Sequence, residues 1–136
     1  MTIQEQLARD EDCRLKPYKD SKGILTLGVG RNIEQVGISI EEAYYLLDND
    51  IRRVKAQLTA NFAWYKSLDE VRQGALINVC FNVGLPKFKT FVKMLAAIEK
   101  QDWAEAAKEL LDSKYAEDVG ARARRLAIQL TEGTWQ

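Results

Sequence analysis

The sequence predicts a mostly helical α+β fold, with a small β-hairpin lobe joined by a long helix to a larger helical lobe and a cleft between the lobes. Four helix-start signatures, one turn-rich segment with strand-prone flanks, and one helical stretch of about 20 residues, ~30 Å long, support this prediction. The length of 136 residues fits a single domain over 1–136. We expect the small lobe over about 13–50, and the helical lobe over about 1–12 and 60–136.

The helices are predicted from capping boxes, in which a side-chain oxygen precedes a glutamate by three residues. These signatures are Thr2-x-x-Glu5, Ser39-x-x-Glu42, Ser67-x-x-Glu70 and Asp102-x-x-Glu105, the last with aspartate as the cap. With the apolar spacing they predict helices over 3–12, 39–59, 68–83, 88–100, 103–113 and 119–131. Gly84 and Gly133 stand where helices should end.

The segment from Leu15 to Gly30 reads as a β-hairpin. Its centre, Asp20-Ser21-Lys22-Gly23, has the composition of a turn, and Tyr18 and Ile24–Leu27 flank it with strand-prone residues. A lone hairpin is only marginally stable in water, so this one must pack against another element.

The stretch 68–83 is apolar on nearly all sides, which predicts a buried central helix. Two amides in it, Asn78 and Asn82, lie four residues apart and share one face. They either satisfy backbone groups inside the core or border a cleft and bind a polar ligand. The residues alone leave both interpretations open.

Composition excludes several functions. The 20 basic and 20 acidic residues balance, which argues against a generally basic nucleic-acid binder. No histidine is present, so acid–base chemistry would use carboxylates, Lys, Tyr or Cys; no metal site and no organic cofactor is implied. Cys13 and Cys80 could form one disulfide, but we expect free thiols. No signal peptide is recognised and no apolar run could span a membrane, so we expect cytoplasmic synthesis.

Glu11 occupies an apolar helical row with Ile3, Leu7 and Leu15, and it has acidic neighbours on both sides. Such surroundings disfavour the charged carboxylate, which suits a general acid. The alternative is a solvated acid at a frayed helix end.

Asp20 in the hairpin turn and Thr26 on the return strand could approach Glu11. Two carboxylates and a small hydroxyl around one space are the groups that glycoside hydrolysis requires. The alternative for Asp20 is an Asx-turn residue, and the Glu-x8-Asp spacing alone is a weak signal.

Longer patterns are more specific. Glu11-x2-Arg14-Leu15-Lys16-x-Tyr18-x-Asp20, followed by Gly23-x2-Thr26-x-Gly28-x-Gly30, resembles the lysozymes of tailed bacteriophages of the T-even type. Later segments fit the same family in order: Ser67-Leu68-Asp69-x-Val71-Arg72, Asn78-x2-Phe81-Asn82-x-Gly84, Trp103-x-Glu105-Ala106-Ala107, Arg122-x-Arg124-Arg125 and Gly133-Thr134-Trp135.

The resemblance implies an endolysin-type muramidase that cuts the β-1,4 bond between N-acetylmuramic acid and N-acetylglucosamine. It implies Glu11 as general acid, Asp20 as the carboxylate that positions or activates water, and Thr26 as the third catalytic-cleft residue. It further implies substrate binding by Asn78, Asn82, Lys114 and Arg122, with Arg122 paired to the catalytic acid. Such a pair would favour the charged form of Glu11 and oppose the desolvation argument.

The sequence also departs from the family. Arg31 stands where T-even relatives have histidine, so an ion pair there would not titrate near neutrality. The segment 32–38 is shorter than in those enzymes, which makes the distal sugar subsites uncertain. Asn82 replaces a larger amide, Lys114 replaces a frequent arginine, and the balanced charge weakens long-range attraction to an anionic wall.

Three other functions compete with the muramidase: a non-catalytic peptidoglycan-binding module, a lytic transglycosylase, and a helical structural protein. Glu11, Asp20 and Thr26 together argue against the first, and Asp20 against the second. For the muramidase we expect a monomer that acts on bacterial peptidoglycan, with inversion, without binding nucleic acid or inserting into membrane. We expect a phage holin to release it to the wall.

Overall fold

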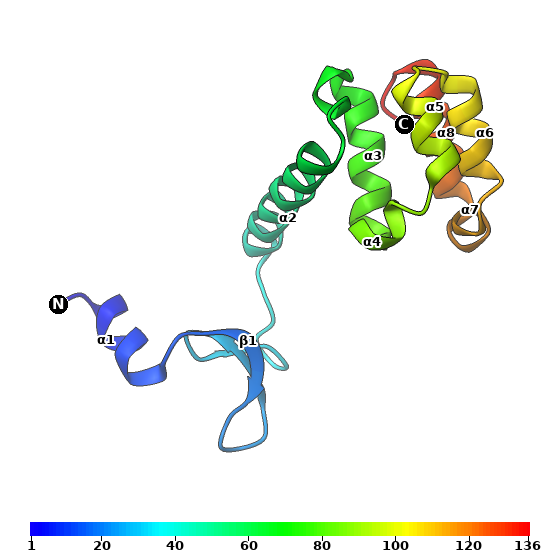
Figure 1. Cartoon of the computed structure of the whole chain (residues 1–136). Helices are drawn as coiled ribbons and strands as arrows, with labels where there is room; N and C mark the ends of the chain where they lie inside the picture. The colour runs from blue at the N-terminus through cyan, green and yellow to red at the C-terminus, as the bar shows by residue number, and fades with distance from the viewer. The chain divides into compact units, whose positions relative to one another are not determined.

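The computed structural model describes residues 1–136, which form two compact units, Met1–Leu47 and Asp48–Gln136 (Figure 1). The predicted class is confirmed, because eight α-helices accompany one small antiparallel sheet of three strands. The assignment of residues 1–12 to a helical lobe stays a prediction. No helix is both long enough and apolar enough to cross a membrane.

In the first unit, helix α1 (Ile3–Glu11) begins with the predicted capping box. The Thr2 hydroxyl accepts a hydrogen bond from the Glu5 amide at 3.2 Å, and the Thr2 amide donates to Glu5 Oε2 at 2.7 Å. The helix ends at Glu11, one residue earlier than predicted, because Asp12 has a φ of 65°. Glu11 is therefore the last residue of the helix.

The sheet contains β1 (Arg14–Lys19), β2 (Leu25–Gly28) and β3 (Arg31–Asn32), in the order β1-β2-β3. The predicted hairpin is confirmed as β1–β2, with Tyr18 opposite Thr26. Strand β3 was not predicted, because two residues are too few to carry an alternating pattern. It pairs with the edge of β2 that β1 does not occupy, and Thr26 lies opposite Asn32. Thr26 therefore lies on the central strand.

Helix α2 (Ile40–Asn61) is the predicted joining helix, and it runs from the first unit into the second. Its 22 residues span about 33 Å at 1.5 Å per residue. The predicted capping box is present: the Ser39 amide donates to Glu42 Oε1 at 2.9 Å, and the Glu42 amide donates to the Ser39 hydroxyl at 3.1 Å. In the second unit α2 buries Val54 and Leu58.

The remaining helices build the second unit around one hydrophobic core. They are the 3-10 helix η1 (Tyr65–Ser67), α3 (Glu70–Val83), α4 (Leu85–Phe88), α5 (Val92–Glu99), α6 (Trp103–Leu111), α7 (Lys114–Val119) and α8 (Ala121–Glu132). Helix α6 packs against both α5 and α8, and α3 contacts α4 and α8 (Figure 1). Tyr65 and Phe88 are fully buried, as are Leu76, Ile98 and Leu110.

Three predicted helix boundaries in this unit are wrong. The cap of α3 is Asp69, which accepts from the Arg72 amide, whereas the Ser67 hydroxyl donates to the Trp64 carbonyl. The predicted helix 88–100 starts later, at Val92, and the separate, unpredicted helix α4 (Leu85–Phe88) precedes it. The predicted helix 119–131 starts later, at Ala121, because Gly120 has a φ of 55° and separates it from the unpredicted α7.

Helix α3 is buried along one face rather than on all sides. Leu76, Val79 and Cys80 lie in the core, whereas Phe81 is 44% exposed. Gly84 ends this helix as predicted, and Gly133 ends α8. Both cysteines are free as predicted: Cys13 is exposed, and burial raises the pKa of the Cys80 thiol.

Arg72 on α3 holds the C-terminal end of α8. Its Nε donates to the Leu130 carbonyl at 2.7 Å and its Nη2 to the Thr131 carbonyl at 3.1 Å, which satisfies helix-end acceptors. The guanidinium also lies 4.3 Å from the centre of the Trp103 ring. This contact joins α3, α6 and α8.

Candidate active site

The seven predicted site residues divide between the two units. Glu11, Asp20 and Thr26 belong to the first unit, whereas Asn78, Asn82, Lys114 and Arg122 belong to the second. The pairing of Arg122 with Glu11 that the resemblance implies stays a prediction.

Glu11 lies against Gly30, in the turn between β2 and β3. A Cβ built on Gly30 would be 2.9 Å from Glu11 Oε2 and 3.3 Å from Glu11 Cδ. A side chain at position 30 would therefore force the Glu11 carboxyl to shift. The end of α1 therefore places the Glu11 carboxyl next to the end of β2.

The apolar surroundings predicted for Glu11 are not provided by its own unit. The row members Ile3, Leu7 and Leu15 are 62%, 46% and 86% exposed, and Glu11 is exposed as well. No element of the first unit covers this row. The apolar surroundings of Glu11 stay a prediction, because regular spacing shows which residues share a face but does not show what packs on it.

Asp20 sits in an Asx turn, which was the alternative interpretation of this residue. Its Oδ1 accepts hydrogen bonds from the amides of Lys22 at 2.8 Å and Ile24 at 2.9 Å. Its Oδ2 accepts no hydrogen bond from the protein. The turn therefore fixes the carboxylate through one oxygen and leaves the other oxygen open, so a structural and a chemical role are compatible.

Thr26 is the only buried polar residue of the first unit, with 4% exposure. Its hydroxyl donates to the Ile24 carbonyl at 2.9 Å, and the Ile24 amide donates to Asp20. Thr26 thus binds the carbonyl of Ile24, and Asp20 binds the amide of the same residue. The structure brings these two predicted residues together through Ile24.

Arg31 forms a two-point ion pair with Glu42, 2.9 Å from Nη1 to Oε1 and 2.8 Å from Nη2 to Oε2. The same Nη1 donates to the Gly37 carbonyl at 3.0 Å. The hydrogen bond from Arg31, helped by the Ser39 amide, lowers the pKa of Glu42 to about 2. The pair ties β3 to the start of α2 across the shortened segment, and its acid titrates far below neutrality, as expected for an arginine at position 31.

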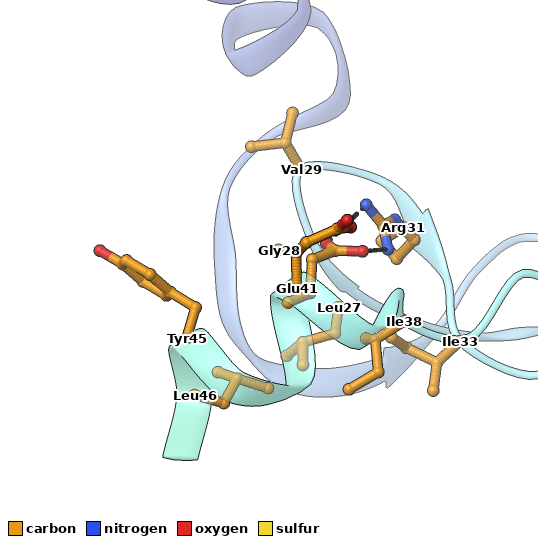
Figure 2. Close-up of a pocket in the computed structure, with 10 residues that line it drawn as sticks. Leu27, Gly28, Val29, Arg31, Ile33, Ile38, Glu41, Tyr45 and Leu46 are labelled. Atoms are coloured by element: carbon orange, nitrogen blue, oxygen red, sulfur yellow. Dashed lines mark hydrogen bonds and ion pairs between the residues drawn. The ribbon is translucent and has the colours of Figure 1, made fainter. Parts of the chain in front are cut away.

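A pocket of about 590 Å³ adjoins this ion pair. Figure 2 shows Arg31 on one side of it and Tyr45 on the opposite side. Leu27, Gly28, Val29, Arg31, Ile33, Ile38, Glu41, Glu42, Tyr45 and Leu46 line it. Sequence reasoning missed this pocket, because its apolar members come from β2, the 33–38 segment and α2, which share no common periodicity.

Asn78 and Arg122 meet between α3 and α8 in the second unit. Arg122 Nε donates to Asn78 Oδ1 at 2.8 Å, and Arg122 Nη2 donates to the Asn78 carbonyl at 3.3 Å. Asn78 is exposed, as is Asn82, so the interpretation of both amides as core residues is wrong. No residue-level pattern signals this contact, because its partners are 44 positions apart.

Lys114 is the first residue of α7, directly after the cap residue Ser113, and its side chain is exposed. A pocket of about 320 Å³ ends at Ser113. It is lined by Thr90, Phe91, Val92, Lys93, Met94, Glu109, Asp112 and Ser113. Sequence reasoning did not single out Glu109 or Asp112, which face solvent-accessible space beside Lys93.

The sequence matches a known protein family. The family model for phage lysozyme matches residues 8–127. The chain is 29% identical over 162 aligned positions to "Probable T4-type lysozyme 1" of Dictyostelium discoideum, with 98% of this chain and 95% of that protein covered. "Probable T4-type lysozyme 2" of the same organism is 28% identical at the same coverage.

A further relative is a phage structural protein. The chain is 30% identical over 162 aligned positions to the "Pre-baseplate central spike protein Gp5" of Enterobacteria phage T4, and it covers 28% of that protein's length. The match includes 98% of this chain. Because one family model spans most of the sequence and full-length relatives align from end to end, the chain belongs to the phage lysozyme family, a family of glycoside hydrolases.

Proposed function

We propose that the chain is a muramidase that hydrolyses the β-1,4 bond between N-acetylmuramic acid and N-acetylglucosamine in peptidoglycan. Glu11 is the general acid, and Asp20 is the carboxylate that positions the water. The observation that carries this proposal is the position of the two carboxylates at opposite ends of β2. Glu11 lies against Gly30 just after the strand, and Asp20 bonds the Ile24 amide just before it.

Glu11 suits the acid role because its carboxyl is exposed and lies against Gly30. Its last-turn position on α1 presents the group to solvent, and the contact with Gly30 limits where it can move. A general acid must come within hydrogen-bond distance of the leaving oxygen. An exposed carboxyl at the end of a helix can meet this requirement.

Asp20 suits the water-positioning role because its two oxygens have different surroundings. Two backbone amides hold Oδ1, so the carboxylate needs no reorientation during the reaction. Oδ2 is available to accept a hydrogen bond from a water. The buried Thr26 supports this arrangement through Ile24. Its hydroxyl donates a hydrogen bond to the Ile24 carbonyl, and the Ile24 amide donates to Asp20.

The proposed stereochemical outcome is inversion. The two anchor points, Ile24 and Gly30, flank the four-residue strand β2 (Leu25–Gly28), which is about 13 Å long at 3.3 Å per residue. We propose that carboxyl groups held at the two ends of this strand stand at the ~6.5–9.5 Å spacing of inverting enzymes rather than the ~5–5.5 Å of retaining ones, and the short Asp20 side chain favours the wider gap. NMR of fresh product should show the α-anomer first. Initial β-anomer would contradict inversion and make Asp20 a nucleophile.

The second unit contributes candidate binding groups. Lys114 and Arg122 are cations, and peptidoglycan carries carboxylates on its peptide stems. Asn82 is an exposed amide on the same helix as Asn78 and can donate to a sugar hydroxyl or acetamide. We therefore assign these residues to substrate binding.

The proposed site of action is the bacterial wall, which a monomeric enzyme would reach from the cytoplasm through a holin. Expression alone should leave bacterial cells intact, and permeabilising the inner membrane should then cause lysis. Prompt lysis without permeabilisation would contradict this route.

One experiment separates the muramidase from its alternatives. Purified protein is incubated with isolated cell walls, and the product ends are read by mass spectrometry. Reducing N-acetylmuramic acid ends indicate hydrolysis, anhydro ends indicate a lytic transglycosylase, and bound but uncut walls indicate a binding module. Asp20→Asn keeps an oxygen for the turn but provides a poor base, so the folded variant should release reducing ends much more slowly.

A further inference from the structure

We propose that Asn78 is a positioning residue for Arg122, holding the guanidinium so that its free edge binds a carboxylate, rather than a residue that contacts the sugar itself. The proposal rests on the proposed muramidase function, and it corrects the role that the sequence suggested for Asn78. The bound carboxylate belongs either to the peptidoglycan or to the protein.

The geometry fixes one edge of the guanidinium. Arg122 Nε and Nη2 both donate to Asn78, to the side-chain Oδ1 at 2.8 Å and to the backbone carbonyl at 3.3 Å. Two bonds to one residue define the plane of the group as well as its position. The backbone acceptor lies within helix α3, so this half of the contact rests on a rigid element.

The two bonds engage both oxygens of Asn78, the side-chain Oδ1 and the backbone carbonyl. The donors left on Asn78 are the two Nδ2 hydrogens. Arg122 keeps both hydrogens on Nη1 and one on Nη2. The larger free donor set therefore belongs to Arg122.

The charge of Arg122 is not neutralised within its unit. Its partner is an amide rather than a carboxylate, and it forms no ion pair there. Arg122 is half-buried. Burial raises the pKa of the Tyr115 phenol, and the charge of Arg122 offsets part of that increase. A fixed, unneutralised guanidinium with a free edge matches a carboxylate in shape and charge.

The test is a double-mutant cycle on wall fragments, with KM and kcat measured separately. Asn78→Ala and Arg122→Ala should each raise KM, by about tenfold for the loss of one charge-assisted hydrogen bond. The double variant should be no worse than Arg122→Ala, because Asn78 acts through Arg122. The control pair combines Arg122→Ala with Asn82→Ala, one turn along α3, and its effects should multiply. Multiplying effects in the Asn78 pair would overturn the proposal.

A second measurement does not depend on activity. The Arg122 Nε–H signal, followed by NMR in protein labelled at arginine, should be protected from solvent exchange in the wild type. It should lose protection in Asn78→Ala and keep it in Asn78→Asp, which retains the acceptor oxygen. Equal protection in the wild type and Asn78→Ala would overturn the proposal, even if the protein cuts no wall. Absence of wall cleavage with the expected NMR result would reject the muramidase function instead.

The source of the carboxylate is decided with wall fragments whose carboxylates have been amidated. If the KM increase of Asn78→Ala disappears on these fragments, Arg122 binds the substrate. If the increase persists but is absent in the Arg122→Ala background, the carboxylate belongs to the protein. An increase that persists in the Arg122→Ala background as well indicates direct contact of Asn78 with the sugar and would overturn the proposal.

Discussion

Glu11 lies directly against Gly30, close enough that a Cβ at Gly30 would stand 2.9 Å from the Glu11 Oε2 atom. The contact explains why a glycine is needed in the turn that follows β2. Gly30 also has a φ of 64°, a conformation that side chains disfavour. One residue thus shapes the turn and leaves space for the proposed acid.

Gly30→Ala should therefore reduce the activity more than a substitution that destabilises the fold by the same amount. Gly28→Ala is the matched control, because Gly28 has a φ of 71° but nothing within 4 Å of the added Cβ. Both variants should lose about 1–2 kcal/mol for the left-handed backbone. Only Gly30→Ala displaces the Glu11 carboxyl, and a shift of that kind can cost about 100-fold in rate. Wall-clearing rates and thermal melting of both variants test this, and equal losses of activity would contradict it.

The Arg31–Glu42 pair should make stability depend on acid pH. The folded-state pKa of Glu42 is about 2, below its ordinary value of 4.5, so its contribution is complete above about 4.5. That contribution is lost as the pH falls from 4.5 towards 2. Glu42→Gln should be less stable than the wild type at neutral pH, and the two should converge near pH 2. Denaturant melts across this range measure the effect.

The neighbouring Glu41 supplies the control for that experiment. Glu41 lines the same pocket but makes no ion pair, so Glu41→Gln should follow the wild-type pH dependence. Because the basic partner is arginine, stability should show no step from this pair between pH 6 and 8. A step near neutrality that disappears in Glu42→Gln would count against the assignment.

The effect of Gly74→Ala on stability should depend on Trp135, destabilising the wild type but stabilising a variant that lacks the tryptophan ring. A Cβ at Gly74 would lie 2.5 Å from the far edge of the Trp135 ring, so Gly74→Ala must displace that ring. Trp135 is 62% exposed and can move, so the cost should be small, with a change in tryptophan fluorescence. In a Trp135→Ala background the same substitution should stabilise α3 by about 0.5–1 kcal/mol, the usual gain over glycine in a helix. Destabilisation in both backgrounds would contradict the contact.

Local signals in the sequence predicted much of the fold. The capping boxes at Thr2 and Ser39 were recognisable because both partners lie within one turn. The cap at Ser67 was assigned wrongly because Asp69, two residues later, offers an equivalent oxygen and the chain at 65–67 winds as a 3-10 helix. Helix α7 has six residues, too few for a helical apolar pattern.

In the candidate site, too, local features could be predicted from the sequence, whereas contacts between distant residues could not. The spacing of Asp20 and Gly23 indicated a turn, and the turn explains how Asp20 is held. The Asn78–Arg122 contact and the Gly30–Glu11 contact join residues that are far apart in sequence, so tertiary packing alone reveals them. For Asn78, the sequence indicated a functional face but not which neighbour the residue serves.

The central claim is that Glu11 delivers the proton to the leaving sugar oxygen, and Glu11→Gln tests it most directly. Glutamine preserves the shape of the side chain beside Gly30 but cannot donate that proton. The wall-clearing rate should fall by at least ~10²–10⁴, the usual contribution of a general acid, while the melting temperature stays near or above the wild-type value. Near-normal clearing by a folded Glu11→Gln variant would contradict the assignment and favour a peptidoglycan-binding role.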